Sequence, residues 1–271
     1  GVNSCKITGD KNDLQDSACY YADACLITGD SNILEYSCFD VGATGPSAPT
    51  TCTITGKYNH LYYGSCVGTS TCGITGDSNK LLQNSCKATS ACTISGGSNY
   101  IYDGACSANN ACAITGSANQ IFQNSCNQPQ ACSIQSGASS NIIRTNACTN
   151  TQACLIGANN NVINSGSCNG GLVACSISTA SNTIQGSSCQ GANACKIATV
   201  GNTIGMASCL GGSACYANNV GGGSCVGYKA CYVAYDVGNG SCNGDYACAK
   251  TTDGTAAGDG VCNAVSACYG M

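Results

Sequence analysis

The chain lacks the side chains from which most large cores are built. It has no Trp, and only 2 Phe and 3 Pro among its 271 residues, while charged residues make up 8%. An average soluble domain has roughly 25% charged residues. Because large aromatic side chains are scarce, we expect a narrow core of small aliphatic residues and cysteine.

Catalytic residue types are equally rare. His60 is the only histidine, Arg144 the only arginine and Glu35 the only glutamate. Catalytic triads, Cys-His pairs and histidine-rich metal sites therefore lack the parts that they require. The sequence predicts that the protein is not an enzyme and holds no cofactor.

Acidic residues gather near the start of the chain, at Asp10, Asp13 and Asp16, with Asp30 one repeat later. Polysaccharide-cleaving β-helix enzymes use clustered Asp together with Lys or Arg. We interpret this group as a solvated face. A weaker alternative is a calcium site, at which Asp10 and Asp30 would stack and bind the ion with backbone oxygens.

Net charge and hydropathy exclude two classes of partner. The formal net charge is −4, and no cluster of Lys and Arg offers a surface for phosphates. No run of eighteen apolar residues could cross a bilayer. We expect neither nucleic-acid binding nor a membrane span, and we expect Gly1 to follow a signal peptide or another upstream segment.

What the chain does have is cysteine at regular intervals. Of the 26 steps between its 27 cysteines, eleven are six residues long and ten are fourteen. This pattern predicts a tandem array of units of roughly twenty residues. A cysteine content this high is typical of secreted proteins, because disulfides persist in oxidising compartments. We therefore predict an extracellular protein.

Aligned units share a consensus of Cys, any residue, Ile, Thr, Gly, two variable residues, Asn, any residue, and Ile or Leu. Alternation of period two predicts short strands, and the Gly-any-any-Asn segment predicts a turn. Such units bury their apolar side only by stacking. We predict an all-β, parallel β-solenoid of about thirteen coils with one disulfide per coil, and stacked Asn side chains along one turn. An Asn-any-Ile turn with irregular unit lengths resembles right-handed parallel β-helices more than left-handed hexapeptide ones, which implies a right-handed coil.

Two disulfide schemes fit the spacing. Pairing across six residues leaves Cys5 unpaired or bridged to another chain, whereas pairing across fourteen residues leaves Cys268 without a partner. We favour the first, which closes one corner of each coil. It resembles the one-bridge-per-coil arrangement of the disulfide-stapled antifreeze solenoids of beetles, with which only the architecture is shared. The predicted six-residue pairs include Cys19 with Cys25, Cys66 with Cys72, Cys86 with Cys92, Cys106 with Cys112, and Cys126 with Cys132.

The repeat changes along the chain. We predict a regular solenoid over residues 1–208, with a Gly-, Pro- and Ser-containing loop inserted at 39–51. Residues 209–271 have shorter spacings and more glycine. We interpret them as thinner coils of the same solenoid, with a separate disulfide domain as the alternative.

Outward-facing positions carry the functional information. An aromatic and aliphatic stripe is predicted on the strand after the Asn column, at Tyr62, Leu82, Tyr100, Tyr102 and Phe122. Exposed apolar surface usually marks an interface. The stripe therefore favours contact with another molecule or a sugar polymer, or burial under the inserted loop. The other strand carries an outward column of Thr. An ice-binding plane requires two regular Thr columns, and the neighbouring outward column, between the Cys and the Ile, contains mixed residue types.

The pieces Ser208 to Cys215, Ser224 to Cys231 and Ser241 to Cys248 share the pattern Ser-Cys-any-Gly-any-any-Ala-Cys. They resemble secreted cysteine-rich repeat proteins of algae and related protists, a resemblance that implies no particular activity. We expect an extracellular structural or adhesive rod that assembles with copies of itself, head to tail or side by side, into filaments or a surface layer. An ice-binding protein and a carbohydrate-binding β-helix, with glycans as partners, are the alternatives.

Overall fold

The computed structural model describes residues 5–19, 25–38, 52–234, 236–249 and 258–268. Within these ranges the secondary structure is β-strand, with no helix; accordingly, the described part of the chain holds no helix suited to crossing a bilayer. The chain forms two compact units, Gly1–Ser140 and Asn141–Met271.

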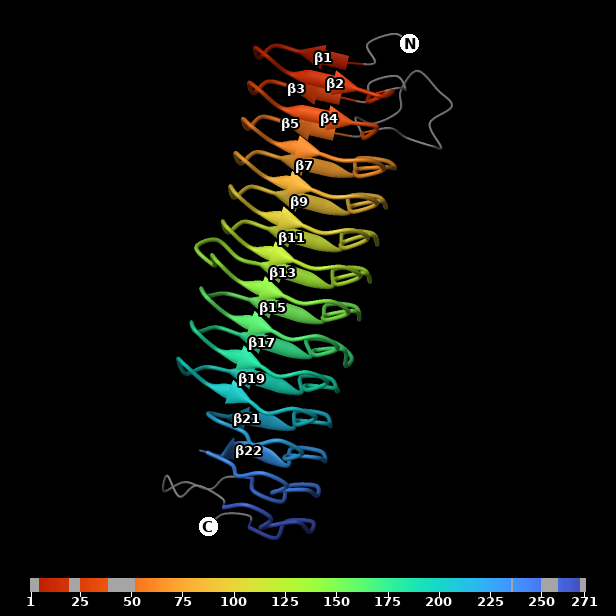
Figure 1. Ribbon diagram of the computed structural model, residues 1–271. Coiled ribbons are helices and arrows are strands. Elements are labelled where there is room, and N and C mark those ends of the chain that lie inside the picture. The colour runs from red at the N-terminus through yellow and green to blue at the C-terminus, as the bar shows by residue number, and fades with distance from the viewer. Residues whose placement is uncertain (1–4, 20–24, 39–51, 235, 250–257, 269–271) are drawn as a thin grey trace. The chain divides into compact units, whose positions relative to one another are not determined.

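The first unit consists of stacked coils with two short strands per coil (Figure 1). One parallel sheet contains β1 (Cys5–Ile7), β3 (Cys25–Ile27), β5 (Cys52–Ile54), β7 (Cys72–Ile74), β9 (Cys92–Ile94), β11 (Cys112–Ile114) and β13 (Cys132–Ile134). The other parallel sheet contains β2 (Asp13–Gln15), β4 (Ile33–Glu35), β6 (His60–Leu61), β8 (Lys80–Leu81), β10 (Tyr100–Ile101) and β12 (Gln120–Ile121).

The second unit repeats this plan. Its Cys-containing strands are β15 (Cys154–Ile156), β17 (Cys175–Ile177), β19 (Cys195–Ile197), β21 (Cys215–Ala217) and β22 (Cys231–Ala234). Its other sheet contains β14 (Ile142–Ile143), β16 (Val162–Ile163), β18 (Thr183–Ile184) and β20 (Thr203–Ile204). After β20, the isolated bridges of Val220 to Ile204 and to Val237 continue the pairing through the shorter coils.

Register follows the repeat without slippage over most strands. Cys72 lies opposite Cys92, and Ile74 lies opposite Ile94. Every second side chain points inward, so from β3 and β4 onward the Ile and Leu columns are buried, while the residues between them are partly or fully exposed; in the first coil, Ile7 is exposed. The predicted all-β parallel β-solenoid, with about twenty residues and one disulfide per coil, is confirmed.

Disulfides close one corner of each coil. All cysteines lie in the described ranges, and 13 bonds join 26 of them, with Cys5 free. Most bonds span six residues, as in Cys66–Cys72, while Cys168–Cys175 spans seven and Cys38–Cys52 fourteen. The first cysteine of each pair has a positive φ, which turns the chain sharply at the corner.

The boundary expected at residue 208 falls inside the second unit. Beyond it, Val220 and Val237 occupy the buried position that Ile fills in earlier coils. The insertion predicted at 39–51 lies outside the described residues, although the Cys38–Cys52 disulfide that brackets it is described.

Candidate functional site

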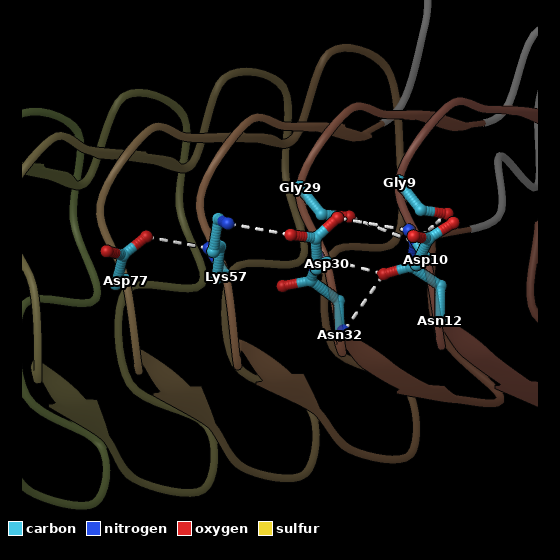
Figure 2. Close-up of polar contacts among 8 residues, drawn as sticks. All are labelled: Gly9, Asp10, Asn12, Gly29, Asp30, Asn32, Lys57 and Asp77. Atoms are coloured by element: carbon cyan, nitrogen blue, oxygen red, sulfur yellow. Dashed lines mark hydrogen bonds and ion pairs between the residues drawn. The ribbon is translucent and has the colours of Figure 1, made fainter.

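In the coils from Asn12 to Asn202, asparagine holds the turn that follows the Cys-containing strand. Asn32 donates two hydrogen bonds to the side-chain oxygen of Asn12, one from its backbone N–H at 2.9 Å and one from Nδ2 at 3.0 Å (Figure 2). Equivalent pairs continue through Asn119 in the first unit and from Asn141 to Asn202 in the second. Because these amides are buried and satisfied, the ladder predicted from sequence is confirmed and its role is structural.

Outside this ladder, a row of polar residues caps the turns of the first unit. Asp30 accepts a hydrogen bond from the backbone N–H of Asp10 at 3.0 Å, and its other carboxylate oxygen lies 2.7 Å from the Lys57 ammonium. Figure 2 shows the row continuing, where the Lys57 N–H donates to Asp77 at 2.7 Å. The hydrogen bond from Lys57 lowers the pKa of Asp30.

This geometry bears on the calcium hypothesis for Asp10 and Asp30. A calcium ion bound there would compete with the Lys57 ammonium for the Asp30 carboxylate. In the described ranges, the groups of three or more potential metal ligands consist of cysteines. All of these except Cys5 are in disulfides and cannot act as thiolates.

Cys5, predicted to be unpaired or intermolecular, is the free cysteine. It is partly buried, and burial raises the pKa of its thiol. The thiolate fraction at neutral pH is correspondingly small, so Cys5 is a weak nucleophile as it stands.

The predicted outer stripe forms a continuous row on the outside of strands β6 to β12; we call Tyr62, Leu82, Tyr100, Tyr102 and Phe122 the aromatic row. Their side chains are partly exposed, because the intervening residues Leu61, Leu81, Ile101 and Ile121 point inward and are fully buried. Tyr102 stacks on Phe122 with ring centroids 4.3 Å apart, and Tyr100 lies 4.9 Å from Tyr102. The rings are thus ordered against each other before any partner arrives.

Charged groups are interleaved with these rings. The Lys80 ammonium lies 5.0 Å from the Tyr62 ring and 5.1 Å from the Tyr100 ring. Its hydrogen bond with Tyr100 raises the pKa of Lys80. His60 stacks on Tyr62 at 3.8 Å and contacts Glu35 at 2.9 Å. The row therefore offers π faces and a cation together.

The Thr file follows the Cys-containing strands of the first unit. Thr8, Thr28, Thr55, Thr75, Ser95 and Thr115 are all exposed. The neighbouring outward column, formed by the middle residue of each Cys-containing strand, is mixed, as expected, and includes Leu26, Gly73 and Ala113. The file has no second regular column of Thr beside it.

A second aromatic surface lies in the second unit and was missed by the sequence reasoning. A groove of about 340 Å³ runs along the outside of β17, β19, β21 and β22. Polar and aromatic side chains in its lining are Ser176, Asn193, Lys196, Ser213, Tyr216 and Tyr232. The available signal was the Cys-Tyr dipeptide that appears at both Cys215 and Cys231.

Comparison with known proteins adds one finding. A family model described as "Domain of unknown function (DUF7640)" matches residues 216–271. No curated protein and no solved structure matches the chain. The matched segment includes Tyr216 and Tyr232 of the groove. The description of the family names no activity. The chain is therefore similar to this family over its C-terminal part.

Proposed function

We propose that the protein is a secreted structural component, a disulfide-stapled solenoid that assembles side by side with other copies through the aromatic row. Secretion is supported by the 13 disulfides, which would not persist in a reducing cytosol. Stacked coils with one bridge at a corner of each coil make a stiff surface, and a stiff surface suits a structural role.

The aromatic row is the observation that carries this proposal. Aromatic residues are enriched in protein interfaces, where they bury large areas. Here Tyr102 and Phe122 are already stacked on a sheet that cannot easily deform. Less conformational entropy is therefore lost when a partner covers them, and a modest contact area suffices for association.

Lateral contact also suits the repeat. The row recurs at the strand spacing of about 4.8 Å, so two copies can interdigitate over several coils. The Lys80 ammonium lies between the Tyr62 and Tyr100 rings, where it can also contact rings of the opposing copy. Weak contacts repeated along the row would add up to stable association.

Sedimentation velocity of the oxidised protein over a range of concentrations tests this proposal. The wild-type protein should form larger species as the concentration rises. The double variant Tyr102→Ser/Phe122→Ser should assemble at least about tenfold less strongly, because two stacked rings are lost. A matched control, Thr93→Ala/Thr115→Ala, alters exposed residues on the other sheet and should behave as wild type.

Two results would defeat the proposal. One is a wild-type protein that stays monomeric at the highest concentration reached. The other is a Tyr102→Ser/Phe122→Ser variant with an intact disulfide pattern that assembles like the wild type, since the interface would then lie elsewhere.

A further inference from the structure

The groove of the second unit has the chemistry of a binding site and is independent of the aromatic row. Tyr216 and Tyr232 occupy equivalent positions in neighbouring coils and lie opposite each other in the sheet. Their ring centroids are 6.0 Å apart and the rings are tilted by 40°. Both rings are partly exposed, with Tyr232 at 38%.

A cation stands at each end of this tyrosine pair. The Lys196 ammonium lies 5.1 Å from the Tyr216 ring, and the Lys229 ammonium lies 5.4 Å from the Tyr232 ring. Lys196, Tyr216 and Tyr232 line the groove. Lys229 lies beside Tyr232 and also faces the rings of Tyr228 and Tyr246, at 5.2 and 5.9 Å.

Neither cation is neutralised by a described partner. In the described part of the chain, the ion pairs are Lys57 with Asp30 and His60 with Glu35, both in the first unit. Charge is also unevenly divided. Residues 1–140 carry five Lys against eight Asp and one Glu, whereas residues 141–271 carry three Lys and one Arg against four Asp. The net charge of −4 therefore belongs to the first unit, and an anion approaching the groove meets a neutral unit.

We propose that this groove binds an acidic polysaccharide, with two sugar rings stacked on Tyr216 and Tyr232 and carboxylate or sulfate groups paired with Lys196 and Lys229. The C–H faces of a sugar pack well on tyrosine rings, which present an apolar body. Ammonium groups form charge-assisted hydrogen bonds with carboxylate or sulfate oxygens. Ser176, Asn193 and Ser213 supply the hydroxyl and amide groups that sugar hydroxyls require.

A nucleic acid would also bring anions and flat rings, but the groove does not favour it. Nucleic-acid affinity depends on many neutralised phosphates. Here one ammonium group, that of Lys196, lines the groove and that of Lys229 lies beside it, and the protein as a whole is acidic. A sugar polymer with one charge per residue or fewer matches this sparse arrangement better.

Isothermal titration calorimetry with the full-length oxidised protein tests the site. The probes are an oligogalacturonate hexamer for carboxylates, a sulfated galactan hexamer for sulfates, a cellohexaose without charge, and a DNA dodecamer of thymidines. We expect one of the two acidic sugars to bind, with affinity that falls as salt is raised. The cellohexaose should bind at least about tenfold more weakly, because it lacks the ionic hydrogen bonds.

Variants locate the binding. Lys196→Gln should weaken the affinity for the acidic sugar at least about tenfold, and Tyr216→Ser about fivefold through loss of stacking. Lys87→Gln is the matched control, because Lys87 is an exposed lysine of the first unit and belongs to neither the groove nor the aromatic row. It should leave the affinity unchanged.

Three outcomes would overturn the proposal: no measurable binding of either acidic sugar, tighter binding of the thymidine oligonucleotide, or equal weakening by Lys87→Gln and Lys196→Gln. Since Lys196 and Tyr216 lie outside the aromatic row, failure here leaves self-assembly standing, and the reverse also holds.

Discussion

Asn99 donates two hydrogen bonds to the side-chain oxygen of Asn79, from its backbone N–H at 2.9 Å and from Nδ2 at 3.1 Å. The same Nδ2 group lies 3.0 Å from the carbonyl oxygens of Gly96 and Gly116. One fully buried amide thereby connects three successive coils. The Asn99 amide thus binds backbone carbonyl groups of the turns, which lie outside the strands and need a donor other than the sheet.

Replacing Asn99 by Ala should destabilise the protein strongly. The change leaves the buried Gly96 and Gly116 carbonyls without this donor, and each unsatisfied buried group costs about 1 to 3 kcal/mol. We expect a loss of about 2 to 4 kcal/mol in the free energy of unfolding, measured by guanidinium denaturation of the oxidised protein. Asn109→Ala, at an exposed corner, should change it by less than about 0.5 kcal/mol. Equal effects of the two changes would show that the ladder contributes no more than a surface amide.

Glycine at the turn is required by close approach between coils. A Cβ atom at Gly96 would lie 1.9 Å from the carbonyl oxygen of Gly116, which belongs to the backbone and cannot move aside. Gly96→Ala should therefore lower the free energy of unfolding by at least about 2 kcal/mol. At Gly73, by contrast, nothing lies within 4 Å of the added atom. Gly73→Ala should be neutral or slightly stabilising, and a denaturation midpoint for Gly96→Ala that matches that of Gly73→Ala would refute the close contact.

The pair of Asp30 and Lys57 predicts a small pH dependence. Because Lys57 lowers the pKa of Asp30, the ionised carboxylate is favoured in the folded state. The stabilisation is present above the unfolded pKa of about 3.9 and is lost as the pH falls through the lowered folded value. It should be slight, since both groups are exposed. Lys57→Met should raise the pKa of Asp30 in an NMR titration of its side-chain carboxyl carbon. Lys87→Met serves as control, and an Asp30 pKa that both variants leave unchanged would exclude the ion pair.

Much of the fold could be predicted from sequence because the same residue recurs at the same place in every coil. A column such as Ile74, Ile94 and Ile114 has few ways to be buried except by stacking. The Asn ladder followed for the same reason, since a polar column beside a buried one must satisfy its own hydrogen bonds. The position and outward direction of the aromatic row followed from alternation around the buried Ile and Leu.

Features that break the repeat could not be predicted in this way. Lys57 interrupts a column that otherwise holds Asp10, Asp30 and Asp77. The alignment makes Lys57 a neighbour of Asp30 but does not show that its ammonium group reaches the carboxylate. Tyr216 and Tyr232 are neighbours through coils that have contracted to sixteen residues, with a register shift after Tyr216. They fall in the column directly after the Cys, which the consensus leaves variable. The groove therefore became visible once the strands were placed side by side.

Each coil is closed on itself at one corner by its own disulfide. This bond fixes the register of the strands that carry the aromatic row and the groove of the second unit. Mass spectrometry of peptides from non-reducing digestion tests this pairing most directly, using a broad-specificity protease that cuts both between Cys66 and Cys72 and between Cys72 and Cys86. The structure predicts that Cys66 is joined to Cys72 and Cys126 to Cys132. Recovery of Cys72 joined to Cys86 would contradict the account.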